Sequence, residues 1–135
     1  MLDFKEISLD QKSMANDYLS KSGYMGCEYN FVNLFIWRNR RKTFLAEKEG
    51  FLFIKSEFRN YFYYLLPAGE GDFEKALNNL IEYSKGTGDS IKISGITDRT
   101  KAMVEGIFPH KFVFTQKRDW ADYVYNAQDL ITLKG

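Results

Sequence analysis

Residues 43–88 read TFLAEKEGFLFIKSEFRNYFYYLLPAGEGDFEKALNNLIEYSKGTG, and this stretch decides the fold. Its first half holds short runs that are rich in aromatic and aliphatic residues, at 43–47, 51–57 and 61–66. Glu49 with Gly50, and Arg59 with Asn60, separate these runs at hairpin spacing. The pattern therefore predicts three strands joined as an antiparallel meander.

The second half of the stretch predicts a helix. Residues 67–71 break the strand pattern with proline and glycine, and Asp72 then supplies an N-cap. Apolar residues follow at helical spacing, at Phe73, Ala76, Leu77, Leu80 and Ile81. This is the clearest periodicity in the chain, and the glycines at 86–88 are expected to end the helix.

Working outward toward the N-terminus, residues 4–7 alternate like a short strand. Ser8 and Gln11 then have the spacing of a capping box. The box predicts a helix that starts at Leu9 and ends near Gly23, which is a natural helix stop.

A second helix is expected after Asn30, which can cap it. Its first turns are apolar on most sides, with Phe31, Val32, Leu34, Phe35 and Ile36. We therefore expect this helix to be deeply buried.

Toward the C-terminus the pattern predicts further elements. They are a buried strand at 91–96, a helix at 97–108, strands at 112–114 and 122–126, and a short helix at 127–133. The predicted class is α/β (α+β), with a mixed, mostly antiparallel central sheet flanked by helices. The order of elements resembles the GNAT-type acyltransferase fold.

Composition limits the function classes. The 135 residues fit a single domain, and 44% of them are hydrophobic. Nineteen basic and 18 acidic residues give a net charge of +1, so no global field attracts nucleic acid or anionic lipid. Cys27 and His110 are the only residues of their types, which excludes an intramolecular disulfide and a Cys/His zinc site. Neither a signal pattern nor a membrane-spanning run is present, and we expect a cytoplasmic domain.

The GNAT resemblance implies a place for coenzyme A. In that fold a Gln/Arg-x-x-Gly-x-Gly/Ala loop after the fourth strand holds the diphosphate at a helix N-terminus. Gly69 and Gly71 match the two glycines, whereas Leu66 stands at the first position. Glu70 and Asp72 place negative charge in the loop, so ordinary turn chemistry is the favoured interpretation.

Several segments resemble one family more closely. They are Glu28-Tyr29-x-Phe31-x-Asn33-Leu34-Phe35-Ile36-Trp37-Arg38, Gly50-Phe51-Leu52, Pro67-x-Gly69-Glu70-Gly71-Asp72, Arg118-Asp119, Asp122-Tyr123-x-Tyr125 and Asp129-Leu130-Ile131-x-Leu133-Lys134-Gly135. In this order they resemble the N-terminal half of proteins of the phosphatidylglycerol lysyltransferase C-terminal domain family. The resemblance implies a tandem of two GNAT-like halves, with residues 1–135 forming the first. It further implies an aminoacyl-tRNA donor and a lipid-headgroup or peptidoglycan-precursor acceptor for the whole protein.

A run of cations follows the second helix. Arg38, Arg40, Arg41 and Lys42 are candidates for contact with tRNA or phosphate. Cations at a helix C-terminus also offset the helix dipole and keep a turn soluble, and this is the favoured interpretation.

Other candidates are isolated residues. Tyr123 and Tyr125 are candidate general acids that also fit plain strand alternation. Glu28 and Glu57 are candidate bases if they are desolvated. No histidine partner is evident for Cys27 as a nucleophile, and the sequence shows no complete catalytic site.

Three functions remain open. The first is a non-catalytic GNAT-like half of an acyl- or aminoacyltransferase that packs against a second half and walls a substrate cleft. The second is a stand-alone N-acetyltransferase that uses acetyl-CoA, and the third is a binding or scaffold domain without a reaction. For this chain alone we expect no cofactor and no metal.

Overall fold

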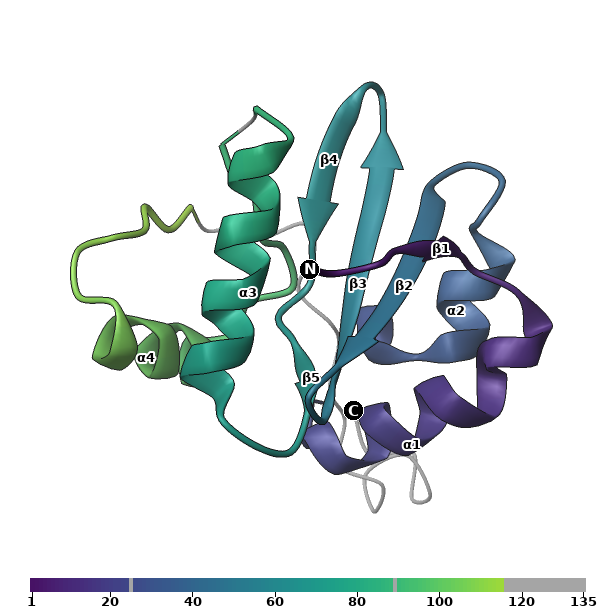
Figure 1. Cartoon of the computed structure of the whole chain (residues 1–135), viewed down its shortest axis with the longest axis horizontal. Helices are drawn as coiled ribbons and strands as arrows, with labels where there is room; N and C mark the ends of the chain where they lie inside the picture. The colour runs from purple at the N-terminus through teal and green to yellow at the C-terminus, as the bar shows by residue number, and fades with distance from the viewer. Residues whose placement is uncertain (25, 89, 116–135) are drawn as a thin grey trace, which may run out of the picture.

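A five-stranded antiparallel sheet forms the centre of the protein, and helices cover both of its faces (Figure 1). The structure is a computed structural model and describes residues 1–24, 26–88 and 90–115. Its elements in chain order are β1 (Lys5–Glu6), the 3-10 turn η1 (Leu9–Gln11), α1 (Lys12–Ser22), η2 (Cys27–Tyr29), α2 (Phe31–Ile36), β2 (Lys42–Lys48), β3 (Phe51–Phe58), β4 (Tyr61–Tyr64), β5 (Ala68–Gly69), α3 (Phe73–Gly86) and α4 (Asp98–Ile107). The predicted fold class, a mostly antiparallel sheet flanked by helices, is confirmed.

The meander forms as predicted. The strands lie in the order β1-β2-β3-β4, with β5 paired to β3. Glu49 and Gly50 both have positive φ between the paired ends of β2 and β3, and so do Arg59 and Asn60 between β3 and β4. Two successive residues with positive φ are typical of the tight turn whose twist matches that of the flanking strands.

The predicted helix caps are also confirmed. The Asp72 side chain accepts a hydrogen bond from the Lys75 N–H at 3.0 Å at the start of α3, and Asn30 does the same for Asn33 at 3.1 Å in α2. Gly23, which was predicted to end α1, is its C-cap and has the left-handed backbone conformation, with φ of 73°.

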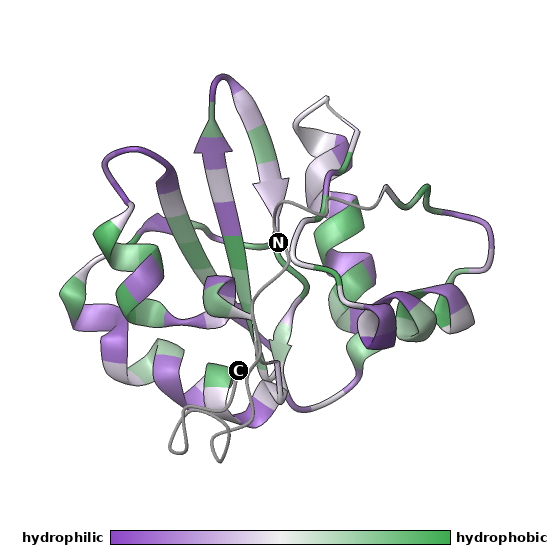
Figure 2. Cartoon of the chain, turned by 180° about the vertical axis from the view of Figure 1, so that it is seen from behind, coloured by the Kyte–Doolittle hydropathy of each residue, from purple (hydrophilic) through white to green (hydrophobic). Residues whose placement is uncertain are grey.

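Each face of the sheet has its own core. On one face, α3 and α4 pack on residues that include Phe53, Tyr64 and Leu66. On the other face, α1 and α2 pack on residues that include Leu45 and Ile54. Figure 2 shows hydrophobic and hydrophilic residues alternating along the helices, as expected for helices that bury only one side.

The helix α2 is less buried than its apolar sequence predicts. Phe31 and Leu34 enter the core, but Val32, Ile36 and Trp37 are 50%, 62% and 51% exposed. The prediction of deep burial was wrong because only one layer of protein packs against this helix in the described residues. Its outer side remains an apolar surface.

The later predicted strands differ from the structure. Residues 91–96 contribute only a parallel bridge from Ile93 to Tyr64, and residues 112–114 form no strand. Phe112 and Phe114 pack on the core while Val113 is 96% exposed, so the alternation reflected burial and not strand pairing. The elements predicted at 122–126 and 127–133 lie outside the described residues.

A β-bulge separates β4 from β5. Lys55 pairs with Tyr64, and Leu52 pairs with Ala68, so residues 53–54 of β3 face residues 65–67. The extra residue leaves the sheet ladder interrupted at this point. The Tyr29 hydroxyl accepts the hydrogen bond from the Leu66 N–H at 3.1 Å, so a buried donor is satisfied by a side chain 37 positions away.

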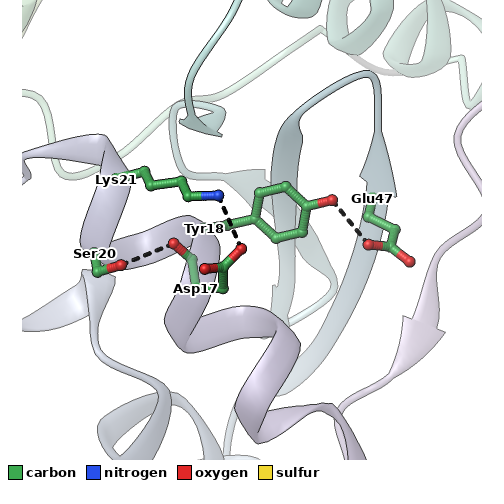
Figure 3. Close-up of polar contacts among 5 residues, drawn as sticks. All are labelled: Asp17, Tyr18, Ser20, Lys21 and Glu47. Carbon is green, nitrogen blue, oxygen red and sulfur yellow. Dashed lines mark hydrogen bonds and ion pairs between the residues drawn. The ribbon is translucent and has the colours of Figure 1, made fainter.

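Two further tyrosines attach helices or loops to the sheet. The Tyr24 hydroxyl donates to the Pro67 carbonyl at 3.0 Å, and its ring lies 4.5 Å from that of Tyr29. The Tyr18 hydroxyl donates to the Glu47 carboxylate at 3.0 Å (Figure 3). This exposed hydrogen bond connects α1 to β2. An ion pair between Lys21 and Asp17 at 3.1 Å lies beside it on α1 (Figure 3).

We predict that Tyr29→Phe lowers the free energy of unfolding by about 1–3 kcal/mol, because it leaves the buried Leu66 N–H without an acceptor. The matched variant Tyr18→Phe removes an exposed hydrogen bond and is expected to cost less than about 1 kcal/mol. Chemical denaturation measures both. Equal losses in the two variants would contradict the structural role of Tyr29.

Stability is also expected to fall at alkaline pH. Burial raises the pKa of Tyr24 to about 12 and raises the pKa of Tyr29 well above its ordinary value. The folded protein therefore holds these protons more tightly than the unfolded chain does, so their contribution is complete below pH about 10 and is lost as the pH rises from there. The expected slope is at most about 1.4 kcal/mol per pH unit for each tyrosine.

Denaturation midpoints between pH 8 and 11.5 test this expectation, with Tyr24→Phe as the variant that removes one titration. A free energy of unfolding that stays constant up to pH 11.5 would overturn it.

Candidate functional site

The loop that carries Gly69 and Gly71 is seated on the turn between β2 and β3. Glu70 donates its N–H to the Gly50 carbonyl at 3.2 Å. A Cβ added at Gly69, where φ is 152°, would overlap that same carbonyl oxygen, and one at Gly71 would lie 3.1 Å from the Phe51 ring. Both glycines thus allow close packing of the loop on the neighbouring turn.

Carboxylates lie where the loop enters α3. A hollow of about 290 Å³ is lined by Glu49, Phe51, Asp72, Lys75 and Ala76. Glu49 forms an ion pair with Lys75 at 3.2 Å, and the hydrogen bond from Lys75 holds the pKa of the Glu49 carboxyl below its ordinary value. Asp72 already accepts from one of the free N–H groups of the helix. The local charges therefore disfavour a diphosphate at this helix end.

The four basic residues at 38–42 do not share one site. Arg38 donates to the Phe35 carbonyl at 2.7 Å, and its guanidinium carbon lies 3.7 Å from the centre of the Phe35 ring. Arg38 thus satisfies a carbonyl at the C-terminus of α2. Lys42 is exposed at the start of β2, whereas Arg40 and Arg41 line a cleft.

This cleft lies between α2 and the sheet and has a volume of about 400 Å³. Its polar lining includes Glu28, Arg40, Arg41, Thr43, Ser56 and Tyr63. Trp37 and Leu34 of the α2 region add apolar surface. Burial raises the pKa of Tyr63, although the nearby Arg41 charge opposes the shift. The cleft combines charges of both signs, hydroxyl groups and an aromatic ring.

Sequence reasoning singled out Glu28, Arg40 and Arg41 but did not bring them together. It missed Ser56 and Tyr63 altogether. The signal was present in the strands: Ser56 lies two residues after Ile54, on the side of β3 that faces α1 and α2. A polar residue at an inward position of an otherwise apolar strand marks a cleft or a polar contact.

The other candidates are dispersed. Cys27 and His110 are exposed, and Cys27 donates a weak hydrogen bond to Glu28. Glu57 is half-buried in β3 and is not among the residues that line the cleft. Phe31 is a core residue stacked on Phe35 at 5.9 Å between ring centres. The candidate acids Tyr123 and Tyr125 lie outside the described residues. Within residues 1–24, 26–88 and 90–115, no three metal-binding side chains come together.

The family model for "phosphatidylglycerol lysyltransferase, C-terminal" matches residues 21–135. The chain belongs to this lysyltransferase family. The sequence resemblance that was noted from short motifs is thereby confirmed. No curated protein matches the sequence of this lysyltransferase-family chain. None of the helices among its described residues is long and apolar enough to cross a membrane.

A solved structure is also similar to this lysyltransferase-family chain. It is a conserved protein of unknown function from Bacteroides thetaiotaomicron, with 34% sequence identity and a TM-score of 0.93. The match covers 100% of this chain and 46% of the other. The chain thus spans about half the length of that relative.

We predict that Gly69→Ala lowers the free energy of unfolding by more than about 2 kcal/mol, because the new Cβ meets the Gly50 carbonyl and the backbone is strained for any side chain. The control is Gly86→Ala at the end of α3, where a Cβ has open space. This control is expected to be neutral or to add up to about 1 kcal/mol. Denaturant titrations compare the two, and a loss no larger than that of the control would contradict the packing described for the loop.

Proposed function

We propose that this chain is a GNAT-like half of an acyl- or aminoacyltransferase and that it packs against a second half to wall a substrate cleft. The observation that carries the proposal is the family match over residues 21–135 in a chain that spans 46% of a relative with the same fold. The order of the first elements, a strand, two helices, a three-stranded meander and a helix, supports the GNAT-like assignment.

The outer side of α2 is the surface that suits such packing. Val32, Ile36 and Trp37 place three large apolar side chains on it, each half exposed or more. Apolar residues that lie together on a surface favour docking over free exposure. This side of α2 also borders the 400 Å³ cleft through Trp37, so a second half placed here would close over it.

The proposed donor is an aminoacyl-tRNA, and the proposed acceptor is a lipid headgroup such as that of phosphatidylglycerol. The family to which the chain belongs supports this class of reaction. Because aminoacyl-tRNA is made in the cytoplasm, the proposal places the domain there. We assign no catalytic residue to this half, and the proposal places the reacting groups in the second half.

The second candidate is a stand-alone acetyltransferase. Gly69 and Gly71 are the feature that favours it, but Glu49 and Asp72 lie beside the helix end that would hold the diphosphate. A ligand present at 100 times its dissociation constant adds roughly 2.7 kcal/mol of stability, so a thermal-shift titration with acetyl-CoA separates the two candidates. Acetyl-CoA is expected to cause no shift.

The main prediction concerns transfer. The isolated chain and the longest natural polypeptide that contains it are each mixed with radiolabelled lysyl-tRNA and phosphatidylglycerol vesicles. We expect labelled lipid from the longer polypeptide and none from the isolated chain, because the proposal places the reacting groups in the second half. Full activity in the isolated chain, or acetyl transfer from acetyl-CoA, would overturn the proposal.

A matched pair of variants tests the docking surface. Ile36→Ser in the longer polypeptide is expected to weaken association of the halves and to reduce transfer at least fivefold. Val113→Ser changes a side chain that is 96% exposed and not on α2, and it is expected to leave transfer unchanged. Limited proteolysis followed by size-exclusion chromatography measures the association directly.

A further inference from the structure

Three charged groups that line the cleft beside α2 have no ionic partner. Glu28, Arg40 and Arg41 form no ion pair with any residue that the structure describes. Elsewhere on the surface, Lys75 is paired with Glu49 and Lys21 with Asp17. Charges of both signs thus lie along one concave surface without an ion pair among the described residues.

Two glycines lie close to the carboxylate of Glu28. A Cβ added at Gly95 would lie 2.7 Å from its Oε1 atom, and one added at Gly26 would lie 2.6 Å from it. Either side chain would displace the carboxylate, so both glycines leave the space that it fills. Cys27 donates a weak hydrogen bond to Oε2 at 3.6 Å. The half-buried Glu28 carboxylate can accept hydrogen bonds from an ammonium group at this end of the cleft.

At the other end of the cleft, hydrogen bonds fix the backbone that carries Arg40 and Arg41. The N–H groups of Arg40 and Arg41 both donate to the Trp37 carbonyl, at 3.0 and 2.9 Å, and the Thr43 hydroxyl donates to the Arg41 carbonyl at 3.0 Å. The Arg41 guanidinium lies 5.3 Å from the centre of the Phe58 ring. Guanidinium groups bind phosphate oxygens in pairs of hydrogen bonds, and two adjacent arginines suit a doubly charged phosphate.

Ser56 and Tyr63 lie opposite each other on β3 and β4 and add two hydroxyl groups to the cleft lining. The volume of 400 Å³ is within the usual range for small-molecule sites. A simple anion would leave Glu28 without a partner, and a simple cation would leave the two arginines without one. A ligand that carries both charges can contact the charged groups of both signs in this lining.

We propose that this cleft binds an aminoalkyl phosphate, in which a phosphate ester and a primary ammonium group are separated by a short carbon chain. The phosphate lies at Arg40 and Arg41, and the ammonium lies at Glu28. The same chemistry occurs in a soluble metabolite and in a lipid headgroup. The site belongs to this half of the protein and does not depend on the transfer reaction proposed above.

Isothermal titration calorimetry on the full chain tests the proposal with four soluble probes. They are phosphoethanolamine, glycerol phosphate, ethanolamine and glycine. Phosphoethanolamine is expected to bind at least tenfold more tightly than each of the others, because it alone has a phosphate and an ammonium group. Equal affinity for phosphoethanolamine and glycerol phosphate, or tighter binding of glycine, would overturn the proposal.

Variants test which end of the cleft binds the ammonium group and which binds the phosphate. Glu28→Gln is expected to remove the preference of phosphoethanolamine over glycerol phosphate, whereas the double variant Arg40→Gln with Arg41→Gln is expected to weaken both at least tenfold. Glu74→Gln on α3 and Arg99→Gln on α4 change exposed charges outside the cleft and serve as matched controls. Circular dichroism verifies that each variant is folded. Unchanged affinities in both cleft variants would show that the ligand binds elsewhere and would overturn the assignment.

The source of the phosphate is decided by a further probe. Soluble dihexanoyl phosphatidylethanolamine is compared with phosphoethanolamine on the same protein. Tighter binding of the short-chain lipid supports a headgroup site, and equal or tighter binding of phosphoethanolamine supports a soluble metabolite. Binding of aminoacyl-RNA without binding of any aminoalkyl phosphate would overturn the proposal. None of these measurements uses the transfer assay, so the two proposals fail independently.

Discussion

The hydrogen bond from the Leu66 N–H to the Tyr29 hydroxyl is the interaction on which the rest of the structure depends. It satisfies the donor that the β-bulge withdraws from the sheet ladder. Because the bulge adds one residue, Leu66 faces α3 while Ala68, two positions later, faces α1. Without this shift Gly69 would not lie opposite Phe51, and the loop at 68–71 would not be seated on the β2–β3 turn.

The same bond links the two candidate sites. Tyr29 ends the η2 turn, which also carries Glu28 into the cleft beside α2. Its hydroxyl reaches the strand that leads to the glycine loop. In the cleft, Glu28, Arg40 and Arg41 form no ion pair with a described residue, whereas beside the glycine loop Glu49 is paired with Lys75 and Asp72 caps α3. The cleft is therefore the site for which we propose a ligand.

This lysyltransferase-family chain has two hydrophobic cores, one on each face of its sheet. Both faces of the sheet are covered, so the fold is supported from either side. The outer face of α2 is apolar and exposed, next to the cleft. In the function proposed above, a second half would dock on this face and close the cleft.

The sequence by itself determined the elements whose signals are local. Tight turns at Glu49 and Arg59, the cap at Asp72 and the periodicity of α3 all arise between residues a few positions apart, and each is found as predicted. The order of the short motifs along the sequence likewise indicated the family, and the family match confirms it. Tertiary structure alone decided the bulge, the exposed side of α2 and the absence of a strand at 112–114. It also decided that Glu28 and Arg41 line the same cleft. These depend on contacts between distant residues, for which burial and strand partners are fixed only when the whole chain has folded.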